Sequence, residues 1–138
     1  MNDPCIFCEI ACRNKPANIV FEDDEIVSFL DIRPVNEGHI LIIPKTHHEY
    51  MFDLDDAFMS HMLVVAKRLS RILKLCFEAP RIGLVIEGFG VPHLHLHLIP
   101  IYRMGDLDPH RAKSQSIEDL EATQRKILST LAKVGLPV

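Results

Sequence analysis

Three histidines alternate with three leucines over residues 93–98. In an extended strand successive side chains point to opposite faces, so His93, His95 and His97 share one face and the leucines share the other. The leucine face suits a core beneath helices. The histidine face has three explanations: a solvated polar surface, a metal site, or nucleophilic and acid–base chemistry on an anionic substrate. Solvated positions usually carry Thr, Lys or Glu, whereas imidazole titrates near neutrality and can attack phosphorus, so the pattern favours chemistry.

Two segments have the periodicity of amphipathic helices. Ser116 is a candidate N-cap for the second of them, and Gly135 and Pro137 should end it. In the first segment the spacing runs through Phe58, Met62, Val65, Leu69, Ile72 and Cys76. In the second it runs through Ile117, Leu120, Gln124, Ile127, Leu131 and Val134.

Five other segments are typical of strands, because they are apolar and β-branched and are bounded by turn residues. They are residues 18–21, 26–31, 39–43, 82–87 and 93–101. The long helix joins the third strand to the fourth, and the other connections are short enough for an antiparallel meander. The expected fold is therefore α+β: an antiparallel meander of about five strands, with the long helix and the C-terminal helix packed on one face.

Length and composition limit the class of protein. The 138 residues suit a single domain, residues 1–138, and a hydrophobic content of 48% supplies a core. The formal net charge of −4 argues against unspecific binding to nucleic acid or to an anionic membrane. The longest apolar run, residues 62–66, is too short to span a membrane. The N-terminus lacks the basic region of a secretory signal, which, with free-looking cysteines, predicts a reducing, cytoplasmic setting.

Cys5 and Cys8 have the two-residue spacing that chelates zinc well. The pair supplies half of a tetrahedral site, so two further ligands must come from elsewhere in the chain. A redox pair and simple buried thiols are the alternatives. Cys12 extends the run toward an iron–sulfur pattern, but a fourth nearby cysteine is lacking.

The His-Leu-His-Leu-His segment, followed by an apolar pair, resembles the signature of the histidine triad (HIT) family of nucleotide hydrolases and transferases. The block from Gly38-His39 to Pro44-Lys45 and His47 resembles the family's second conserved block. Residues 19–24 and 29–32 resemble its N-terminal hairpin, and residues 5–10 its zinc-bearing start. The resemblance covers roughly residues 4–103, and the predicted C-terminal helix over residues 116–134 is not diagnostic.

The resemblance implies catalytic roles. The middle histidine of the triad is the family's nucleophile, so His95 is expected to attack the α-phosphorus of a nucleotide and form a covalent nucleotidyl-histidine, which water then hydrolyses. His97 and His39 are expected to contact the phosphate or to orient His95. The attacking ring must be neutral, and its other nitrogen needs an acceptor such as a backbone carbonyl. The transferase branch commonly has glutamine at the third triad position, so His97 favours hydrolysis.

The resemblance also implies a binding site for the nucleoside, which we expect to be a purine nucleoside. Asp31 is expected to hold the ribose hydroxyls, although a turn or capping role would also explain an acid there. Apolar side chains are expected to sandwich the base, although each would serve equally as ordinary core. They are Phe7, Ile10, Phe29 and Ile32.

One stretch departs from the family pattern. Many nucleotide-hydrolysing relatives carry Ser or Thr and Gln shortly before the triad and an Asn in the preceding strand. This chain has Phe89-Gly90-Val91-Pro92 before the triad and Ile86-Glu87 at the Asn position. The backbone N–H groups of Gly90 and Val91 remain able to hold a phosphate. The departure bears on the leaving group and leaves the nucleophile in place.

In relatives that keep both cysteines, the histidine after Pro-Lys and the first triad histidine complete a structural zinc site. The resemblance therefore implies zinc held by Cys5, Cys8, His47 and His93, with His48 as an alternative to His47. A closed shell of this kind stabilises the fold and leaves no position for substrate.

The expected function is a HIT-type nucleotide hydrolase that cleaves at the α-phosphate of nucleoside phosphoramidates or dinucleoside polyphosphates. The alternatives are a hydrolase with a catalytic zinc held by the histidine cluster, and a nucleotide-binding module that does not catalyse. The family typically forms twofold dimers through edge strands and the long helix. An open meander needs such cover for its edges, so we expect a homodimer.

Overall fold

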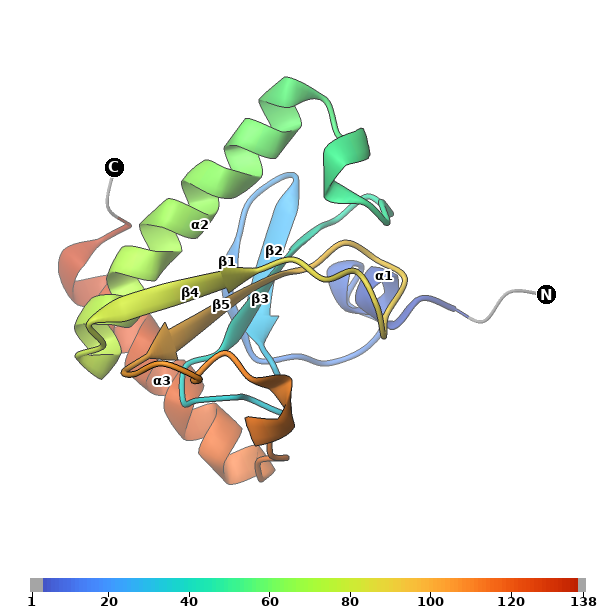
Figure 1. Ribbon diagram of the computed structural model, residues 1–138. Helices are drawn as coiled ribbons and strands as arrows, with labels where there is room; N and C mark the ends of the chain where they lie inside the picture. The colour runs from blue at the N-terminus through green and yellow to red at the C-terminus, as the bar shows by residue number, and fades with distance from the viewer. Residues whose placement is uncertain (1–3, 137–138) are drawn as a thin grey trace.

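The computed structural model describes residues 4–136, and its centre is a five-stranded antiparallel sheet with the order β1-β2-β3-β5-β4 (Figure 1). The strands are β1 (Ile19–Glu22), β2 (Ile26–Leu30), β3 (Ile40–Pro44), β4 (Arg81–Val85) and β5 (Leu96–Ile101). The helices are α1 (Ile6–Ala11), α2 (Asp56–Phe77) and α3 (Ile117–Val134), with short 3-10 turns η1 (Met51–Asp53) and η2 (Pro109–Arg111). The predicted α+β fold is confirmed.

Helix α2 follows the predicted apolar stripe and extends it slightly at both ends. Its N-cap is Asp55, whose carboxylate accepts a hydrogen bond from the backbone N–H of Phe58 at 2.7 Å. It ends where Glu78 adopts a left-handed conformation, with φ of 51°. Most of the stripe is buried against the sheet, which explains why the spacing alone located this helix.

Helix α3 begins as predicted, because the Ser116 hydroxyl accepts a hydrogen bond from the N–H of Asp119 at 3.0 Å. Gly135, at φ of 69°, ends it. Pro137, the other predicted stop signal, lies outside the described residues. Helices α2 and α3 pack together and share one core with one face of the sheet, as Figure 1 shows on the left of the molecule.

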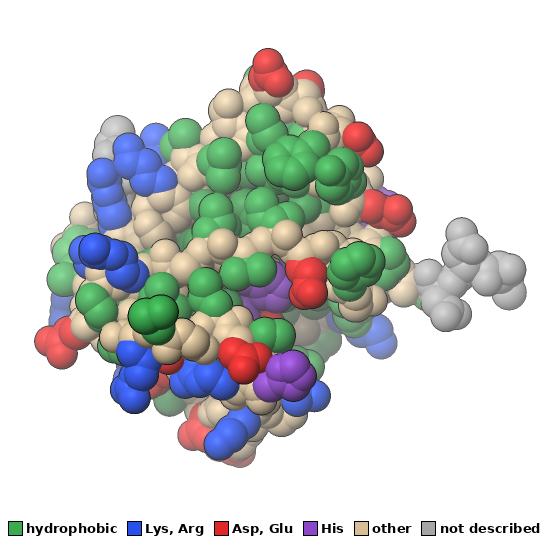
Figure 2. All heavy atoms as spheres, in the orientation of Figure 1, with side chains coloured by type: hydrophobic (Ala, Val, Ile, Leu, Met, Phe, Trp, Pro, Cys, Tyr) green, Lys and Arg blue, Asp and Glu red, His purple; other side chains and the backbone are tan. Residues whose placement is uncertain are grey.

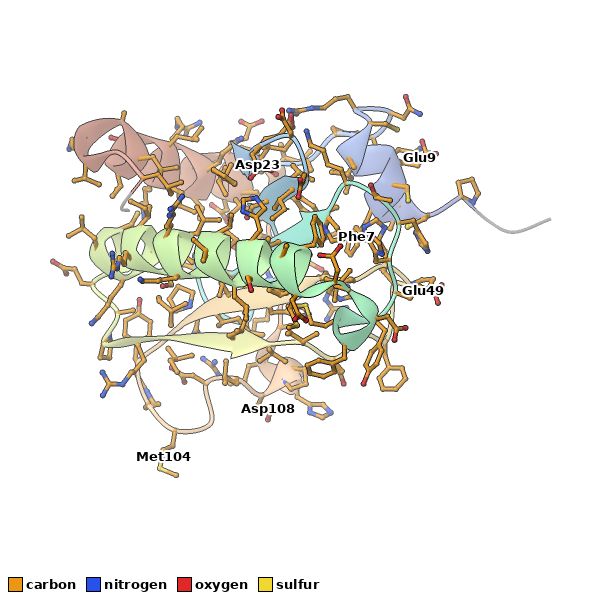
Figure 3. The ribbon with its side chains drawn as sticks, turned by 90° about the horizontal axis from the view of Figure 1, so that it is seen from above. Phe7, Glu9, Asp23, Glu49, Met104 and Asp108 are labelled. Atoms are coloured by element: carbon orange, nitrogen blue, oxygen red, sulfur yellow. The ribbon has the colours of Figure 1, made fainter. Side chains whose placement is uncertain are left out.

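The central strand β3 is buried on both faces. Ile40 and Ile42 point into the main core beneath α2 and α3. Leu41 and Ile43 point to the opposite face, where they pack in a smaller core with Phe7 of α1. The short helix α1 was not predicted. It lies with the segment after β3 at one end of the molecule, where Figure 3 labels Phe7, Glu9 and Glu49.

The predicted meander needs one correction, because β5 lies between β3 and β4. The 22-residue helix α2 carries the chain past the position beside β3, so β4 becomes the edge strand. The hairpin that follows brings β5 back, where Leu41 pairs with His97 and Val85 pairs with His97 from the other side.

The last strand is also shorter than predicted, because it begins at Leu96 rather than at His93. The N–H of His93 bonds to the carbonyl of Val91 at 2.8 Å, and the N–H of Leu94 bonds to the carbonyl of His48 at 2.6 Å. One of these bonds lies within a turn and the other reaches the segment after β3, and together they stand in place of a strand ladder. His93 and His95 therefore belong to a turn and an extended segment before β5, and only His97 lies in the strand.

Within the described residues, no helix has the length and apolar character needed to cross a membrane.

Candidate active site

A cleft with a volume of about 720 Å³ opens on the sheet face that carries α1. His95 and His97 line it, together with Asp31 at the end of β2. A cleft of this size is within the range that holds a small molecule of nucleotide size. The structure thus brings Asp31 to the same cavity as two histidines that lie more than sixty residues later in the sequence.

His95 is 6% exposed, and its Nδ1 lies 2.7 Å from the carbonyl oxygen of His93. A carbonyl oxygen only accepts, so Nδ1 carries the ring proton and donates it. In the neutral ring, the other nitrogen, Nε2, then bears a lone pair. The expected backbone acceptor for the ring is therefore present, and it belongs to the residue two positions earlier in the chain.

His39 precedes β3 and is 3% exposed. The backbone N–H of Val35 donates to its Nδ1 at 3.0 Å, so the ring proton must be on Nε2. Nε2 lies 2.9 Å from Nδ1 of His97 and 3.5 Å from a carboxylate oxygen of Asp31. His39 therefore donates to His97, and it interacts more weakly with Asp31.

The bond from His39 also fixes the proton of His97. Because Nδ1 of His97 accepts, its proton is on Nε2, and this neutral ring presents an N–H group. Burial lowers the pKa of His97 to about 4, helped by the nearby ring of His95. Burial likewise lowers the pKa of His39 to about 3, with a smaller contribution from His97. Both rings are therefore uncharged at neutral pH.

Gly38 explains why the segment before β3 places His39 at this point. Its φ is +91°, a conformation that favours glycine, and a side chain there would collide with the ring of Phe77 at the end of α2. The chain can therefore pass close beneath α2 only with glycine at this position. His39 follows directly and points to the opposite side, toward β5 and His97.

Asp31 follows β2, and its backbone N–H donates to the carbonyl of His39 at 3.0 Å. One carboxylate oxygen accepts from the N–H of Arg33 at 2.9 Å, and the other faces His39. Burial raises the pKa of Asp31 above its ordinary value, against the lowering effects of the Arg33 amide and of His95. The group is thus a half-buried hydrogen-bonding carboxyl at the wall of the cleft.

The four apolar side chains predicted at the nucleoside end all line the cleft. Phe7 contacts Phe29 edge to face at 5.5 Å between ring centroids, and it contacts the His95 ring at 5.2 Å. Phe7, Ile10 and Phe29 are buried in the smaller core, whereas Ile32 is 67% exposed at the mouth of the cleft. Three of the four thus serve both as core and as cleft wall.

Gly90 and Val91 line the cleft beside His95, as predicted. Other lining residues were not predicted. Phe89 is 79% exposed, and it projects from a turn whose flanking glycines have positive φ. Helix α3 contributes Ile117, Leu120 and Glu121, which no sequence signal connects with the triad. Only the packing of α3 on the sheet brings them there.

A second cluster lies at the end of the molecule where α1 meets the segments after β3 and before β5. It consists of Cys5, Cys8, His47 and His93, whose donor atoms all lie within 4.8 Å of one another. The Nδ1 atom of His93 is 3.3 Å from Sγ of Cys5 and 3.5 Å from Sγ of Cys8. Nδ1 of His47 is 3.3 Å from Sγ of Cys8. Tetrahedral zinc places sulfur and nitrogen ligands about 3.5 Å apart, so the set fits zinc.

The second nitrogens of these rings support the same interpretation. Nε2 of His93 lies 2.8 Å from the carbonyl oxygen of Pro44, so it carries the proton and leaves Nδ1 free to bind a metal. Nε2 of His47 lies 3.6 Å from a carboxylate oxygen of Glu49. Burial, with the neighbouring thiol of Cys5, raises the pKa of Cys8 to about 11, and a bound cation would favour its thiolate instead. His48 lies against Phe58 and does not join the cluster.

Asp31, His39 and His97 also gather donor atoms within 4.8 Å of one another, but their hydrogen bonds argue against a metal there. The N–H of Val35 occupies the Nδ1 lone pair of His39, and the proton occupies Nε2. His39 therefore has no free lone pair to offer a metal. The group is better described as a hydrogen-bonded chain, in contrast to the cysteine cluster.

Comparisons with known proteins agree with the fold. The family model described as HIT domain matches residues 12–104, and the chain belongs to the HIT family. It is 39% identical over 97 residues to adenosine 5'-monophosphoramidase HNT1 of Saccharomyces cerevisiae, covering 70% of this chain and 61% of that protein.

Solved structures of the family superimpose closely. A Hit-like protein from Bartonella henselae, described as involved in cell-cycle regulation, has a TM-score of 0.83 at 28% identity, covering 95% of this chain and 98% of that one. A zinc-bound histidine triad family protein from Mycobacterium smegmatis has a TM-score of 0.79 at 31% identity, covering 94% of each chain.

Proposed function

We propose that this protein is a nucleotide hydrolase that cleaves the bond between the α-phosphorus of a nucleotide and its leaving group. The observation that carries the proposal is the hydrogen bond from Nδ1 of His95 to the carbonyl of His93, at 2.7 Å. It orients the imidazole and, in the neutral form of the ring, leaves the Nε2 lone pair available at the cleft. The naming of the yeast relative as an adenosine 5'-monophosphoramidase supports the same class of reaction.

In the proposed reaction, Nε2 of His95 attacks the α-phosphorus, and the bond from phosphorus to the leaving nitrogen or oxygen breaks. The leaving atom takes a proton from water. A second water then attacks the nucleotidyl-histidine, the P–N bond to His95 breaks, and the nucleoside monophosphate is released. The Nε2–H group of His97 donates to a phosphoryl oxygen. The ring is already in this neutral donor form at neutral pH, so it does not have to bind a proton first. His39 holds His97 in this form, and the N–H groups of Gly90 and Val91 supply further donors.

For the nucleoside, we propose that the carboxylate of Asp31 accepts hydrogen bonds from the ribose hydroxyls. The purine base would lie among the apolar residues at the α1 end of the cleft. These apolar residues are Phe7, Ile10, Phe29 and Ile32.

The charge of the cleft favours phosphoramidates over dinucleoside polyphosphates. Among the described residues that line it, the charged side chains are Asp31 and Glu121, both acidic, and neither Lys nor Arg is present. His97 is uncharged at neutral pH, so it offers a phosphoryl oxygen a neutral donor. Within this cleft, a chain of phosphates with several negative charges would meet two acids and no cation, and Arg33 lines only the adjoining cavity that shares Asp31 and His97. A single phosphoryl group with one charge fits better.

Turnover of adenosine 5'-phosphoramidate tests the proposal. We expect His95→Ala to lose at least about a thousandfold in kcat, because the nucleophile is removed, and rapid quenching of wild-type protein should trap an adenylate on His95. The matched control is His110→Ala, since the ring of His110 is 93% exposed and does not line the cleft. Equal turnover by His95→Ala and His110→Ala would disprove the proposed function. Binding without an adduct or turnover would support the non-catalytic alternative.

We further propose zinc in the cysteine cluster as a structural ion. It would link α1, the segment after β3 and the segment before β5 through its four ligands. Chelation then separates this proposal from a catalytic zinc: loss of structural zinc lowers stability first, whereas loss of catalytic zinc removes turnover from a protein that remains folded. All four cysteines of the chain are free thiols, consistent with the reducing, cytoplasmic setting that we propose.

We also propose a homodimer formed through α2 and the edge strand β4. Figure 2 shows apolar side chains gathered over these two elements. The exposed apolar residues there include Leu63 and Val64 on α2 and Leu84 on β4, each at least 41% exposed. β4 has one free edge, which pairing with a second copy would satisfy.

A further inference from the structure

The chain after β5 returns to the catalytic side of the sheet and crosses the segment between β2 and β3. Residues 111–115, which we call the strap, run beside residues 32–36. The backbone N–H of Lys113 donates to the carbonyl of Pro34 at 3.2 Å, and that of Gln115 donates to the carbonyl of Ile32 at 3.3 Å. The strap lies beyond residue 104, where the match to the HIT family model ends.

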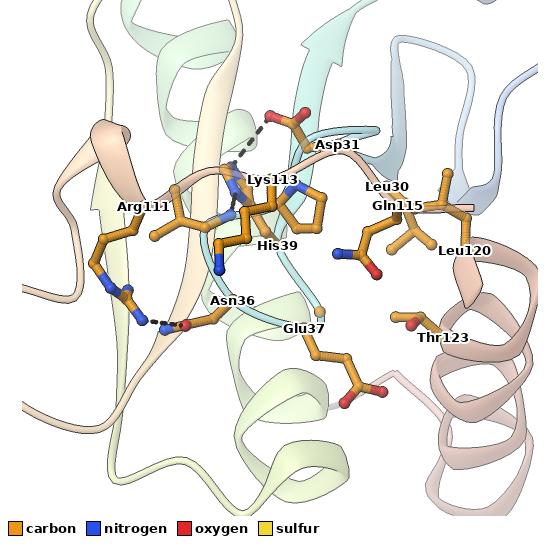
Figure 4. Close-up of a pocket in the computed structure, with 13 residues that line it drawn as sticks. Leu30, Asp31, Asn36, Glu37, His39, Arg111, Lys113, Gln115, Leu120 and Thr123 are labelled. Atoms are coloured by element: carbon orange, nitrogen blue, oxygen red, sulfur yellow. Dashed lines mark hydrogen bonds and ion pairs between the residues drawn. The ribbon is translucent and has the colours of Figure 1, made fainter. Parts of the chain in front are cut away.

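Arg111 makes the shorter of two side-chain contacts between the strap and this segment (Figure 4); in the other, Nη2 of Arg33 donates to the carbonyl of Ala112 at 3.5 Å. Nη2 of Arg111 donates to the side-chain oxygen of Asn36 at 3.0 Å, and its Nη1 donates to the carbonyl of Asp106 at 2.9 Å. The amide nitrogen of Asn36 donates in turn to the carbonyl of Pro100 in β5, at 2.7 Å. Both terminal nitrogens of the Arg111 guanidinium thus have an acceptor, and Asn36 connects Arg111 to strand β5.

The same segment carries the donor that fixes the proton of His39. The N–H of Val35 bonds to Nδ1 of His39 at 3.0 Å, and the N–H of His39 bonds to the carbonyl of Asn36 at 3.1 Å. The position of the Val35 amide therefore depends on the conformation of residues 34–38. Asn36, which Arg111 holds, is the residue next to it.

We propose that Arg111 is a positioning residue that, through Asn36, keeps the Val35 amide on Nδ1 of His39 and thereby keeps the protons of His39 and His97 on their Nε2 atoms. The consequence for catalysis rests on the proposed function; the consequence for the tautomers does not. Arg111 acts on the reaction only through these residues, because it does not line the cleft that holds His95.

Loss of this arrangement has a defined chemical effect. Without the Val35 donor, the proton of His39 can move to Nδ1. Its bare Nε2 would then face the bare Nδ1 of His97 at 2.9 Å, which is repulsive unless His97 also moves its proton to Nδ1. His97 would then present a lone pair, instead of an N–H group, to a phosphoryl oxygen. The transition state would lose one hydrogen-bond donor.

Nitrogen-15 NMR of the histidine rings tests the tautomers directly, since protonated and bare ring nitrogens have well-separated shifts. We expect wild-type protein at neutral pH to show His39 and His97 protonated on Nε2. Arg111→Met, which keeps the apolar stem, should shift a measurable fraction of both rings toward the Nδ1–H form, and Arg111→Lys should restore part of the wild-type pattern. The matched control is Arg13→Met, which removes a comparable pair to Glu22 at 2.6 Å, away from the site.

Kinetics on the phosphoramidate supply the second measurement. We expect Arg111→Met to lower kcat about tenfold with little change in KM. In a fraction of the molecules His97 lacks its Nε2–H donor, which is needed only in the transition state. Asn36→Ala should cause a similar loss, and the double variant should lose no more than either single change. Arg13→Met should keep wild-type kcat.

Three results would overturn the inference. They are wild-type His39 protonated on Nδ1, an unchanged tautomer pattern in both Arg111→Met and Asn36→Ala, or independent and additive losses in the double variant. A protein that fails to hydrolyse phosphoramidates but shows the expected tautomer change would refute the proposed function and leave the positioning role of Arg111 in place.

Discussion

The carbonyl oxygen of His93 accepts the ring proton of His95, while the ring of His93 faces the thiols of Cys5 and Cys8. One residue thus contributes its backbone to the candidate nucleophile and its side chain to the candidate metal site. Movement of His93 would alter the direction in which Nε2 of His95 points. The position of the cysteine cluster and the orientation of the His95 ring at the cleft are therefore coupled through a single residue, His93.

Removal of the metal should first cost stability and then activity. We expect Cys8→Ser to lower the melting temperature and to abolish its dependence on zinc, because a ligand at 3.3–3.5 Å from both histidine nitrogens is lost. Free zinc at about 1,000 times its Kd would contribute about 4 kcal/mol to wild-type stability. Cys12→Ser is the control, since Cys12 is exposed and outside the cluster. Zinc-independent melting of the wild type would contradict the metal site.

Acid should destabilise the fold through the two buried rings of the candidate site. The pKa values of His39 and His97 are lowered to about 3 and about 4, below the ordinary value of 6.5. Between pH 6.5 and these lowered pKa values, the unfolded chain therefore binds more protons than the folded chain. The free energy of unfolding thus falls as the pH drops from 6.5 toward 4. Each ring contributes up to about 1.4 kcal/mol per pH unit.

Denaturant unfolding at a series of pH values measures that slope. We expect His97→Gln to have a shallower slope than wild type over this window, because one titrating ring is gone. His110→Gln removes a 93% exposed ring that bonds to Asp108 on the surface, and it is the control for loss of a histidine outside the buried pair. Parallel slopes in all three proteins would show that the buried rings are not the source of acid sensitivity.

Asp31→Asn should reduce kcat/KM for ribonucleotide substrates by about ten- to a hundredfold, because a charged acceptor for the ribose hydroxyls is replaced by a neutral amide. A 2',3'-dideoxy phosphoramidate offers no hydroxyls and should be hydrolysed equally well by variant and wild type. An equal loss on both substrates would instead place Asp31 in the support of His39, which it approaches at 3.5 Å.

Gly38→Ala should destabilise the fold by about 2 kcal/mol or more, because alanine is strained at φ of +91° and its methyl group meets the Phe77 ring. Gly88→Ala is the matched control: φ is +89° there, but no atom lies within 4 Å of an added methyl group. Combining Gly38→Ala with Phe77→Ala should recover part of the specific penalty. Equal free energies of unfolding for the two alanine variants would exclude the Phe77 contact as the cause.

The proposed dimer predicts different effects from two similarly exposed leucines. Leu63 on α2 is 41% exposed and Leu128 on α3 is 42% exposed. We expect Leu63→Glu to give a monomer in analytical ultracentrifugation, since it places a charge in the proposed α2–β4 interface, whereas Leu128→Glu should remain dimeric. A monomeric wild-type protein would refute the dimer outright.

Much of the architecture followed from local pattern. The stripes of α2 and α3, their caps at Asp55 and Ser116, and the number of strands are set by side-chain periodicity and by hydrogen bonds over three residues. The sequence pattern also singled out the triad and the Cys5–Cys8 pair, because histidine and cysteine are rare where a plain sheet surface would suffice, whereas His39 was implied only by the resemblance to the family's second conserved block.

Other features depended on the packed chain. The position of β5 between β3 and β4, and its start at Leu96, result from the length of α2 and from the bond between Leu94 and His48. The cleft walls from α3 and the strap at Arg111 lie far along the chain from the triad. Their approach depends on the main core, which no local spacing encodes.

The positions of the ring protons show most clearly the difference between what local sequence predicts and what the folded chain decides. Alternation singled out His93, His95 and His97 as candidates for chemistry, since strand geometry and imidazole chemistry are local properties, and the family resemblance added His39 and the expected role of each ring. Which nitrogen of each ring is bare was decided by the carbonyl of His93, the amide of Val35 and the carbonyl of Pro44. A ring cannot select its tautomer alone, because the two forms are close in energy until a fixed donor or acceptor in the folded chain separates them.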